Sequence, residues 1–233
     1  MRLILLILLN ILGFLAFGQQ QAILFSDAIQ PHLKKYNIQS DIEFEKGDIE
    51  RGQFLFDSLV KNYLVGSRFD DYTLKNVNGR KVKLSKIKKP IYVITYASWC
   101  VIDKGEIPAL NKLSKKYAKK VQFVVICWDK KRKAKGLAKK FSSNIKVCFA
   151  NESYRNDSKV VSVLKHTLGF PTSYFLNEKL EVVDIKRGGA QTGPKSNYLK
   201  SYKANYDLFD IRITDCLLKK DIIQESQLAA VED

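Results

Sequence analysis

The residues with the clearest chemical potential stand at positions 99–103, where the chain reads Trp-Cys-Val-Ile-Asp. Cys100 follows an apolar run at 91–96, which we expect to be a strand buried on both faces of a parallel sheet. A cysteine between such a strand and a helix gains thiolate character from the unpaired N–H groups and the dipole of the helix. The pattern therefore predicts a nucleophilic thiol at Cys100.

Asp103 stands three residues after Cys100, where a two-cysteine exchange site has its second thiol. In such a site the second thiol resolves the mixed disulfide, and an aspartate cannot do so. The carboxylate also opposes a nearby thiolate by repulsion, while an acidic residue suits the first turn of a helix. The sequence leaves the balance of these two effects open.

The sequence does not indicate a metal or a cofactor. Its two histidines, His32 and His166, lie far apart, and its four cysteines include no Cys-x-x-Cys spacing. Zinc sites need ligands clustered in this way. We therefore predict no metal site and no cofactor.

The elements around Cys100 alternate between strand and helix. The turn signal Asn78-Gly79 joins a predicted hairpin at 72–84, and a helix from about Cys100 to Tyr117 should be kinked by Pro108. Further strands are expected at 121–127 and 145–149, helices at 131–141 and 158–166, and a closing hairpin at 173–186. Such alternation predicts an α/β fold with a central mixed sheet and helices on both faces.

The start of the chain has the pattern of a secretory signal. An apolar run at 3–17 follows Arg2, and the small residues Ala16 and Gly18 suit a cleavage site. The run is shorter than the roughly 20 residues of a membrane-spanning helix, so an uncleaved anchor is the second choice. We predict a signal peptide at 1–18 and a location in the periplasm or cell envelope. A largely helical extension at 19–65, a main domain at 66–203 and a tail at 204–233 follow.

The chain is strongly basic, with a formal net charge of +16. Its lysines are spread along the sequence, which is typical of solvated helix faces. The densest basic run, at 129–135, has no interleaved aromatic residues suited to stacking on bases. We therefore predict no nucleic-acid partner, and keep attraction to an anionic membrane surface or to acidic partners as a minor alternative.

Four segments together resemble the thioredoxin-like superfamily, and within it the exported TlpA/ResA-type thiol-disulfide oxidoreductases, or redoxins. They are the hairpin with Asn78-Gly79, the block from Trp99-Cys100 through Glu106, Pro108 and Leu110, the loop Gly169-Phe170-Pro171-Thr172, and the hairpin before Arg187-Gly188-Gly189. The resemblance spans about residues 66–203 and implies a thioredoxin-like fold. This chain departs from the family's CxxC motif, because Asp103 replaces the second cysteine.

The resemblance also implies roles for individual residues. Pro171 would follow a cis peptide bond and face Cys100, and its loop would bind an extended protein thiol or disulfide with Phe170 and Trp99. Glu106 matches the family motif by position, but we expect it to be exposed and to need no function.

The other three cysteines leave alternatives open. By the resemblance, the strand ending at Cys127 lies beside the strand that leads to Cys100, so Cys127 is the candidate resolving thiol. We favour a buried core cysteine, because free cysteine behaves as a small hydrophobic residue. Cys148 is also expected in the core, with a Cys127–Cys148 disulfide as the lesser alternative. Cys216 would be a free thiol or an intermolecular link in the tail.

Two functions follow from these residues. The first is a monothiol exchange protein that forms or reduces mixed disulfides through Cys100. The second is a redox-inactive binding or scaffold module of the cell envelope that keeps the same groove. A peroxidase is disfavoured, because Val93 and Ala97 replace the proline and threonine of the Pro-x-x-x-Thr-x-x-Cys pattern of peroxiredoxins. The sequence gives no basis for predicting the oligomeric state.

Overall fold

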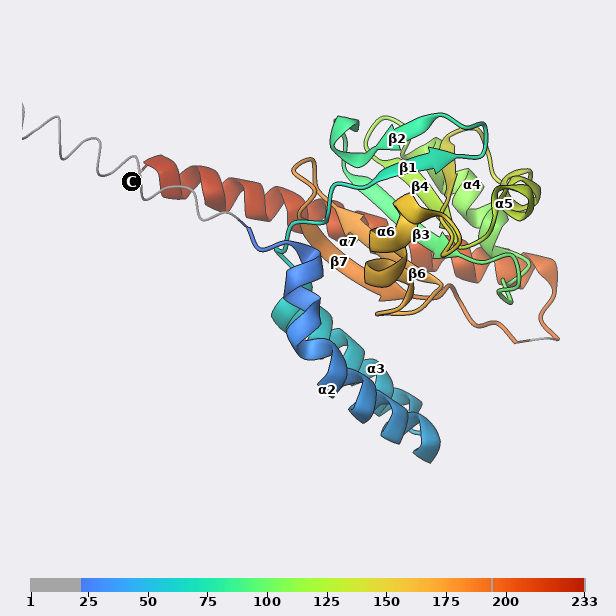
Figure 1. The fold of residues 1–233 in the computed structure, drawn as a ribbon, viewed down its shortest axis with the longest axis horizontal. Coiled ribbons are helices and arrows are strands. Elements are labelled where there is room, and N and C mark those ends of the chain that lie inside the picture. The colour runs from blue at the N-terminus through green and yellow to red at the C-terminus, as the bar shows by residue number, and fades with distance from the viewer. Residues whose placement is uncertain (1–21, 194, 233) are drawn as a thin grey trace, which may run out of the picture.

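The computed structural model describes residues 22–193 and 195–232, with side chains up to residue 221. Seven strands form one mixed sheet in the order β2-β1-β5-β4-β3-β6-β7 (Figure 1). The central pairs β3·β4 and β4·β5 are parallel, and the other pairs are antiparallel. The strands are β1 Thr73–Asn76, β2 Lys81–Lys83, β3 Ile91–Tyr96, β4 Gln122–Cys127, β5 Ile145–Phe149, β6 Thr172–Leu176 and β7 Val182–Arg187.

Helices cover both faces of this sheet, as the sequence predicted. One face packs against α4 (Glu106–Lys116), α5 (Lys131–Ala138) and α7 (Tyr198–Glu232). The other packs against α2 (Phe25–Lys46), α3 (Ile49–Leu59), the short α6 (Ser158–Val160) and its continuation at Val161–Lys165. Neighbouring residues of β3 belong to opposite hydrophobic clusters, so the predicted strand buried on both faces is confirmed.

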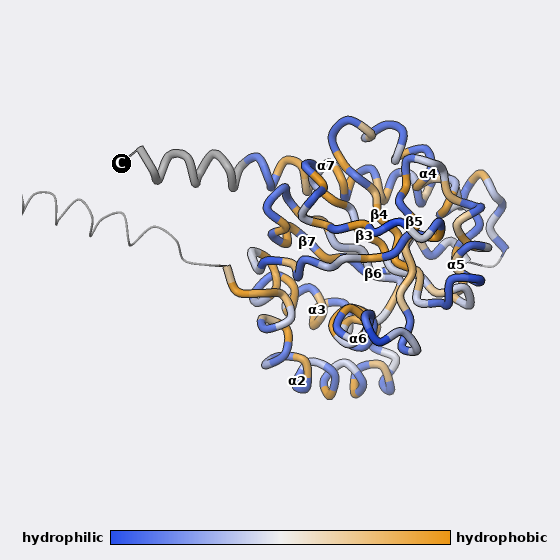
Figure 2. Tube along the Cα trace, turned by 45° about the horizontal axis from the view of Figure 1, so that its top comes forward, coloured by the Kyte–Doolittle hydropathy of each residue, from blue (hydrophilic) through white to orange (hydrophobic). Residues whose placement is uncertain are grey.

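The N-terminal extension is a helical hairpin that projects from the sheet (Figure 1). Gly47 ends α2 in a left-handed conformation (φ 73°), and the Asp48 side chain caps α3 by accepting the Arg51 N–H at 2.8 Å. Hydrophobic and hydrophilic residues alternate along α2, as Figure 2 shows. At its start, the Ser26 N–H donates to buried Asp70 at 3.0 Å, and Lys159 of α6 pairs with the same carboxylate at 2.6 Å. The bond from Ser26 ties the start of α2 to the segment that leads into β1, and Lys159 ties α6 to the same segment.

The first helix after β3 begins later than predicted. It starts at Glu106, so Cys100 lies in the preceding loop and Pro108 is the third helical residue. The predicted start at Cys100 and the predicted kink at Pro108 are therefore wrong. A proline in the first turn removes no helical hydrogen bond, because the first N–H groups of a helix have no partner inside it.

The C-terminal residues form a large part of the packed domain. Helix α7 begins before the predicted boundary at residue 203 and buries Phe209, Ile213 and Cys216 against the sheet. Cys216 is therefore a core residue rather than an accessible thiol in a tail. The predicted signal peptide at 1–18 lies outside the described residues. Within the described ranges, no helix is long and apolar enough to cross a membrane.

Candidate active site around Cys100

Cys100 lies in the loop at 97–105, which joins the end of β3 to α4. A tight turn holds it there: the Cys100 N–H donates to the Ala97 carbonyl at 3.0 Å, and the Ala97 N–H donates to the Cys100 Sγ at 3.3 Å. The cysteine is half-buried, whereas Trp99 and Val101 on either side are 69% and 99% exposed. The thiol therefore sits at the surface between two exposed apolar side chains.

A second loop contributes Phe170 and Pro171 to the same place. The Phe170–Pro171 peptide bond is cis, which confirms the prediction made from the family resemblance. The rings of Trp99 and Phe170 meet edge to face, with centroids 5.2 Å apart. Cys100 and Phe170 also pack against the same hydrophobic cluster. The structure thus brings the two predicted motifs together, although they are about 70 residues apart in the sequence.

The thiol of Cys100 is not activated in the predicted way. Its pKa is raised, first by burial and then by the negative charges of Asp129 and Glu106, while the hydrogen bond from the Ala97 N–H acts in the opposite direction. The expected lowering by a helix N-terminus is wrong, because α4 begins six residues after Cys100. Dipole stabilisation is confined to the first turn of a helix.

Asp103 serves the local structure. Its Oδ1 accepts the Gly105 N–H at 3.1 Å, its carbonyl accepts the Glu106 N–H at 3.0 Å, and its Oδ2 accepts the Thr192 hydroxyl at 2.6 Å. The residue that replaces the second cysteine therefore prepares the start of α4 and ties this loop to the segment before α7. It is not among the charges that raise the pKa of Cys100.

Asp129 is a site residue that the sequence analysis missed. Its carboxylate accepts the Ser98 N–H at 2.6 Å, the Ser98 hydroxyl at 2.7 Å and the Cys127 thiol at 3.1 Å. Burial raises the pKa of Asp129, but these hydrogen bonds and nearby Lys133 outweigh it and hold the pKa below the usual range. Its position just after the end of β4, beside the end of β3, was the available signal.

Cys127 donates to the same Asp129 oxygen, Oδ2, that accepts the Ser98 N–H, and it is fully buried. Burial, and then the hydrogen bond and charge of Asp129, raise its pKa well above that of a free thiol. A Cys100 thiolate would raise it further, so the two thiols are electrostatically coupled. The preference for Cys127 as a core cysteine agrees with this burial.

A Cys127–Cys148 disulfide is excluded by the register of the sheet. Cys127 pairs with Phe149, and Cys148 pairs with Ile126, so the two sulfurs point to opposite faces. All four cysteines are free. Burial raises the pKa of Cys148 and that of Cys216 to about 12 in each case.

Glu106 is buried, contrary to the expectation from the sequence. Only 4% of it is exposed, and the Tyr96 hydroxyl donates to its carboxylate. Burial raises the pKa of Glu106, although the bond from Tyr96 opposes that rise. Glu106 is part of the site, because its carboxylate acts on the Cys100 thiol. Sequence spacing alone did not identify Tyr96 as its partner.

The start of helix α7 packs directly against Gly105, at the end of the Cys100 loop. A Cβ atom on Gly105 would lie 2.1 Å from the Tyr202 backbone nitrogen, and the Gly105 N–H donates to the Ser201 hydroxyl at 2.7 Å. Gly189 likewise leaves room for Glu106, whose Oε2 would lie 2.7 Å from an added Cβ. Only glycine allows these two approaches without displacement.

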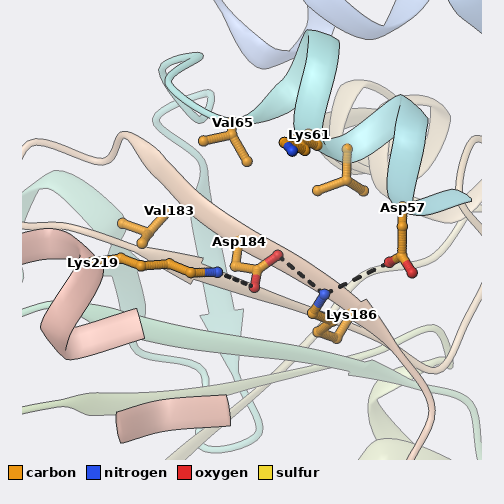
Figure 3. Close-up of a pocket in the computed structure, with 8 residues that line it drawn as sticks. Asp57, Lys61, Val65, Val183, Asp184, Lys186 and Lys219 are labelled. Carbon is orange, nitrogen blue, oxygen red and sulfur yellow. Dashed lines mark hydrogen bonds and ion pairs between the residues drawn. The ribbon is translucent and has the colours of Figure 1, made fainter. Parts of the chain in front are cut away.

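A pocket of about 440 Å³ lies away from this site, between α3, β7 and α7 (Figure 3). Lys186 in it pairs with Asp184 at 3.7 Å and with Asp57 at 3.6 Å, while Lys219 pairs with Asp184 at 3.3 Å. None of the predicted site residues lines this pocket. In the described part of the chain, no group of His, Cys, Asp or Glu side chains is arranged to hold a metal ion.

The fold and the paired Cys100 and Pro171 loops define a thioredoxin-like redoxin. The sequence profile of the AhpC/TSA family matches residues 65–185, more than half of the chain. The chain therefore belongs to the AhpC/TSA family.

Individual relatives carry related names. The chain is 29% identical over 124 residues to the thioredoxin-like protein YneN of Bacillus subtilis (strain 168), a match that covers 53% of this chain and 71% of that protein. A structure from Chlorobium tepidum, assigned as thiol:disulfide interchange protein DsbE, is 24% identical with a TM-score of 0.49, covering 66% of this chain and 97% of its own. The thioredoxin domain of a thiol-disulfide oxidoreductase from Bacteroides vulgatus is 17% identical with a TM-score of 0.47, covering 63% and 95%. Both TM-scores are below 0.5, so the family assignment rests on the sequence profile.

Proposed function

We propose that this protein is a TlpA/ResA-type thiol-disulfide exchange protein that acts through Cys100 alone. The observation that carries the proposal is the position of the thiol: Cys100 is half-buried between exposed Trp99 and Val101, and Phe170, next to cis Pro171, packs against the Trp99 ring. An extended segment of a partner protein would bind across these two loops and present a disulfide to the sulfur.

With a single thiol, the site can carry out the first step of disulfide exchange but needs a second thiol to complete it. The Cys100 thiolate attacks a partner disulfide, a Cys100–partner disulfide forms, and the second partner sulfur leaves as a thiolate and takes up a proton. Asp103 cannot resolve this intermediate. Cys127 is buried and stays protonated beside Asp129, which supports release by an external thiol. Resolution by Cys127 is the alternative within the same proposal.

A redox-inactive binding or scaffold module is the second candidate, and the raised pKa of Cys100 favours it. A thiol whose pKa lies above that of free cysteine is mostly protonated at neutral pH, and the thiolate is the nucleophile. Under this alternative, Trp99, Phe170 and Pro171 would bind a partner without exchange.

We also propose export to the periplasm or cell envelope, with residues 1–18 as a cleaved signal peptide. The predictions of a protein thiol or disulfide as substrate, and of no cofactor, belong to the same proposal. N-terminal sequencing of the mature protein from its host tests the cleavage after residue 18.

The first test is the pH dependence of Cys100 alkylation by iodoacetamide, followed by mass spectrometry. Cys100→Ser is the blank, and Asp103→Cys restores the two-cysteine spacing for comparison. Exchange with a peptide disulfide, detected as a Cys100–peptide adduct that an external thiol releases, supports the monothiol function. A Cys100 that is alkylated only when the protein unfolds, and that forms no adduct, leaves the binding module as the function.

A further inference from the structure

The apolar residues next to Cys100 form a small exposed surface. Trp99 and Val101 are exposed, Phe170 is partly buried beneath the Trp99 ring, and none of the described residues covers the outer side of Trp99 or Val101. We call Trp99, Val101 and Phe170 the thiol patch. Such a patch around a nucleophile is suited to a protein partner.

A basic segment lies beside the Cys100 loop on the α5 side. The two hydrogen bonds from Ser98 to Asp129 hold the end of β4 against the Cys100 loop, and the run Lys130-Lys131-Arg132-Lys133 begins at the next residue. All four cations are exposed, and no described carboxylate lies within 4.0 Å of any of them. Lys130, Lys131 and Arg132 therefore have free charge to offer a partner, whereas Lys133 also acts on the Asp129 carboxylate.

Further exposed cations lie on the α7 side of the Cys100 loop. Lys104 belongs to the Cys100 loop itself, and Lys200 lies in the first turn of α7, next to the Ser201 that binds Gly105. The carboxylates nearby are turned inward or engaged: Glu106 and Asp129 are buried, and Asp103 accepts the Thr192 hydroxyl. Exposed cations consequently lie next to the Cys100 loop on both its α5 side and its α7 side.

We propose that the thiol patch and the basic segment together select acidic protein partners. This inference rests on the proposed function and adds the charge of its substrate. A surface with one sign of charge around a reactive group raises the local concentration of oppositely charged partners and speeds their association. We favour a protein over a membrane surface, because the cations lie next to the loop that carries the thiol, and a protein, unlike a membrane surface, supplies a disulfide to it.

The test compares two peptide disulfides that differ only in their flanking residues, aspartate in one and lysine in the other. The second-order rate constants for adduct formation with Cys100 are measured at low and at high salt. We expect the acidic peptide to react about tenfold faster than the basic peptide at low salt, and the ratio to approach one at high salt. Equal rates at low salt would overturn the proposal.

A matched pair of variants locates the effect. Lys130→Glu, Lys131→Glu and Arg132→Glu are combined in one variant, and acidic residues suit the N-terminus of α5, so folding is not opposed. Lys88→Glu, Lys119→Glu and Lys120→Glu form the control, because these exposed lysines lie together at the other end of β3 and β4. Lys133 is left in place because it stabilises the Asp129 carboxylate.

The ratio of the two rates is the readout, because a change in thiol acidity alters both peptides equally. We expect the ratio to fall about tenfold in the first variant and to change less than twofold in the control. Equal falls in both variants would show an effect of net charge alone and would refute a docking surface. Loss of binding to phosphatidylglycerol vesicles in the first variant, with an unchanged ratio, would assign the basic segment to a membrane and also refute it.

One further measurement separates this inference from the proposed function. If Cys100 forms no adduct with either peptide, exchange through Cys100 fails as a function. Binding of the same peptides, with serine replacing cysteine, to the Cys100→Ser protein then tests the charge preference alone. Tighter binding of the acidic peptide supports the docking surface, and equal binding of both overturns it.

Discussion

The two sides of the Cys100 loop are held by different physical means. On the α5 side, one carboxylate, Asp129, accepts hydrogen bonds from Ser98 and Cys127. On the α7 side, the backbone at Gly105 approaches Tyr202 so closely that a side chain cannot fit between them. The α5 side therefore acts on the thiol mainly through charge, and the α7 side mainly through packing. Substitutions on the two sides should change different properties of the protein.

The largest expected effect is on the α7 side. Gly105→Ala places a Cβ 2.1 Å from the Tyr202 nitrogen, so α7 or the loop must move. We expect a loss of about 3 kcal/mol in the free energy of unfolding, at the upper end for overpacked sites. Urea unfolding measures it. Gly136→Ala is the control, because nothing lies within 4 Å of its Cβ, and it should gain up to about 1 kcal/mol as a helical residue. A similar stability for both variants would contradict the close packing.

The next effect is on the α5 side and concerns the thiol. Asp129→Asn removes a negative charge that raises the pKa of Cys100, so that pKa should fall and the alkylation curve should shift to lower pH. At a pH below the pKa of Cys100 in both proteins, the variant has more thiolate than the wild type. We therefore expect its alkylation to be severalfold faster there. Asp157→Asn is the control, since Asp157 also accepts a backbone N–H but is not among the charges acting on Cys100. An unchanged alkylation curve in Asp129→Asn would refute the electrostatic role of the α5 side.

A smaller effect is expected when a hydrogen bond on the α7 side is removed and the packing is kept. Thr192→Val keeps the shape of the side chain and removes the hydroxyl that donates to Asp103 at 2.6 Å. We expect a loss of about 1 kcal/mol in the free energy of unfolding, and an unchanged pH dependence of Cys100 alkylation. Thr167→Val, which removes a hydroxyl bonded to the Val163 carbonyl, is the control. A shift of the alkylation curve in Thr192→Val alone would mean that Asp103 acts on the thiol after all.

Local signals in the sequence were sufficient for the sheet. The apolar runs that became β3, β4 and β5, and the Asn78-Gly79 turn, depend on neighbours a few residues away. These strands and this turn need no knowledge of distant contacts. The cis bond at Pro171 was predicted from the family resemblance of the motif Gly169-Phe170-Pro171-Thr172.

The site itself depends on contacts that no local pattern shows. The burial of Glu106 requires Tyr96 from the preceding strand and Gly189 from more than 80 residues away. The start of α4 was predicted too early because a thioredoxin-type site has its helix directly after the cysteine, whereas here the loop continues to Gly105, whose N–H donates to Asp103, and α4 begins at Glu106. For α7 a signal existed: Phe209, Ile213 and Cys216 have the spacing of one apolar helix face.

The last prediction concerns Glu106, whose carboxylate lies next to Gly189 on the α7 side of the loop. It tests whether this side also acts on the thiol through charge. Glu106→Gln removes the second negative charge that raises the pKa of Cys100, so alkylation should again shift to lower pH. The increase in rate should be smaller than in Asp129→Asn, because Asp129 has the larger influence and burial already raises the pKa of Glu106, which favours its neutral form. Tyr96→Phe removes the hydrogen bond that lowers the pKa of Glu106, which favours the neutral form of Glu106, so it should accelerate alkylation no more than Glu106→Gln does. If Glu106→Gln exceeds Asp129→Asn in rate, the main electrostatic control of Cys100 lies on the α7 side, and the contrast between the two sides is wrong.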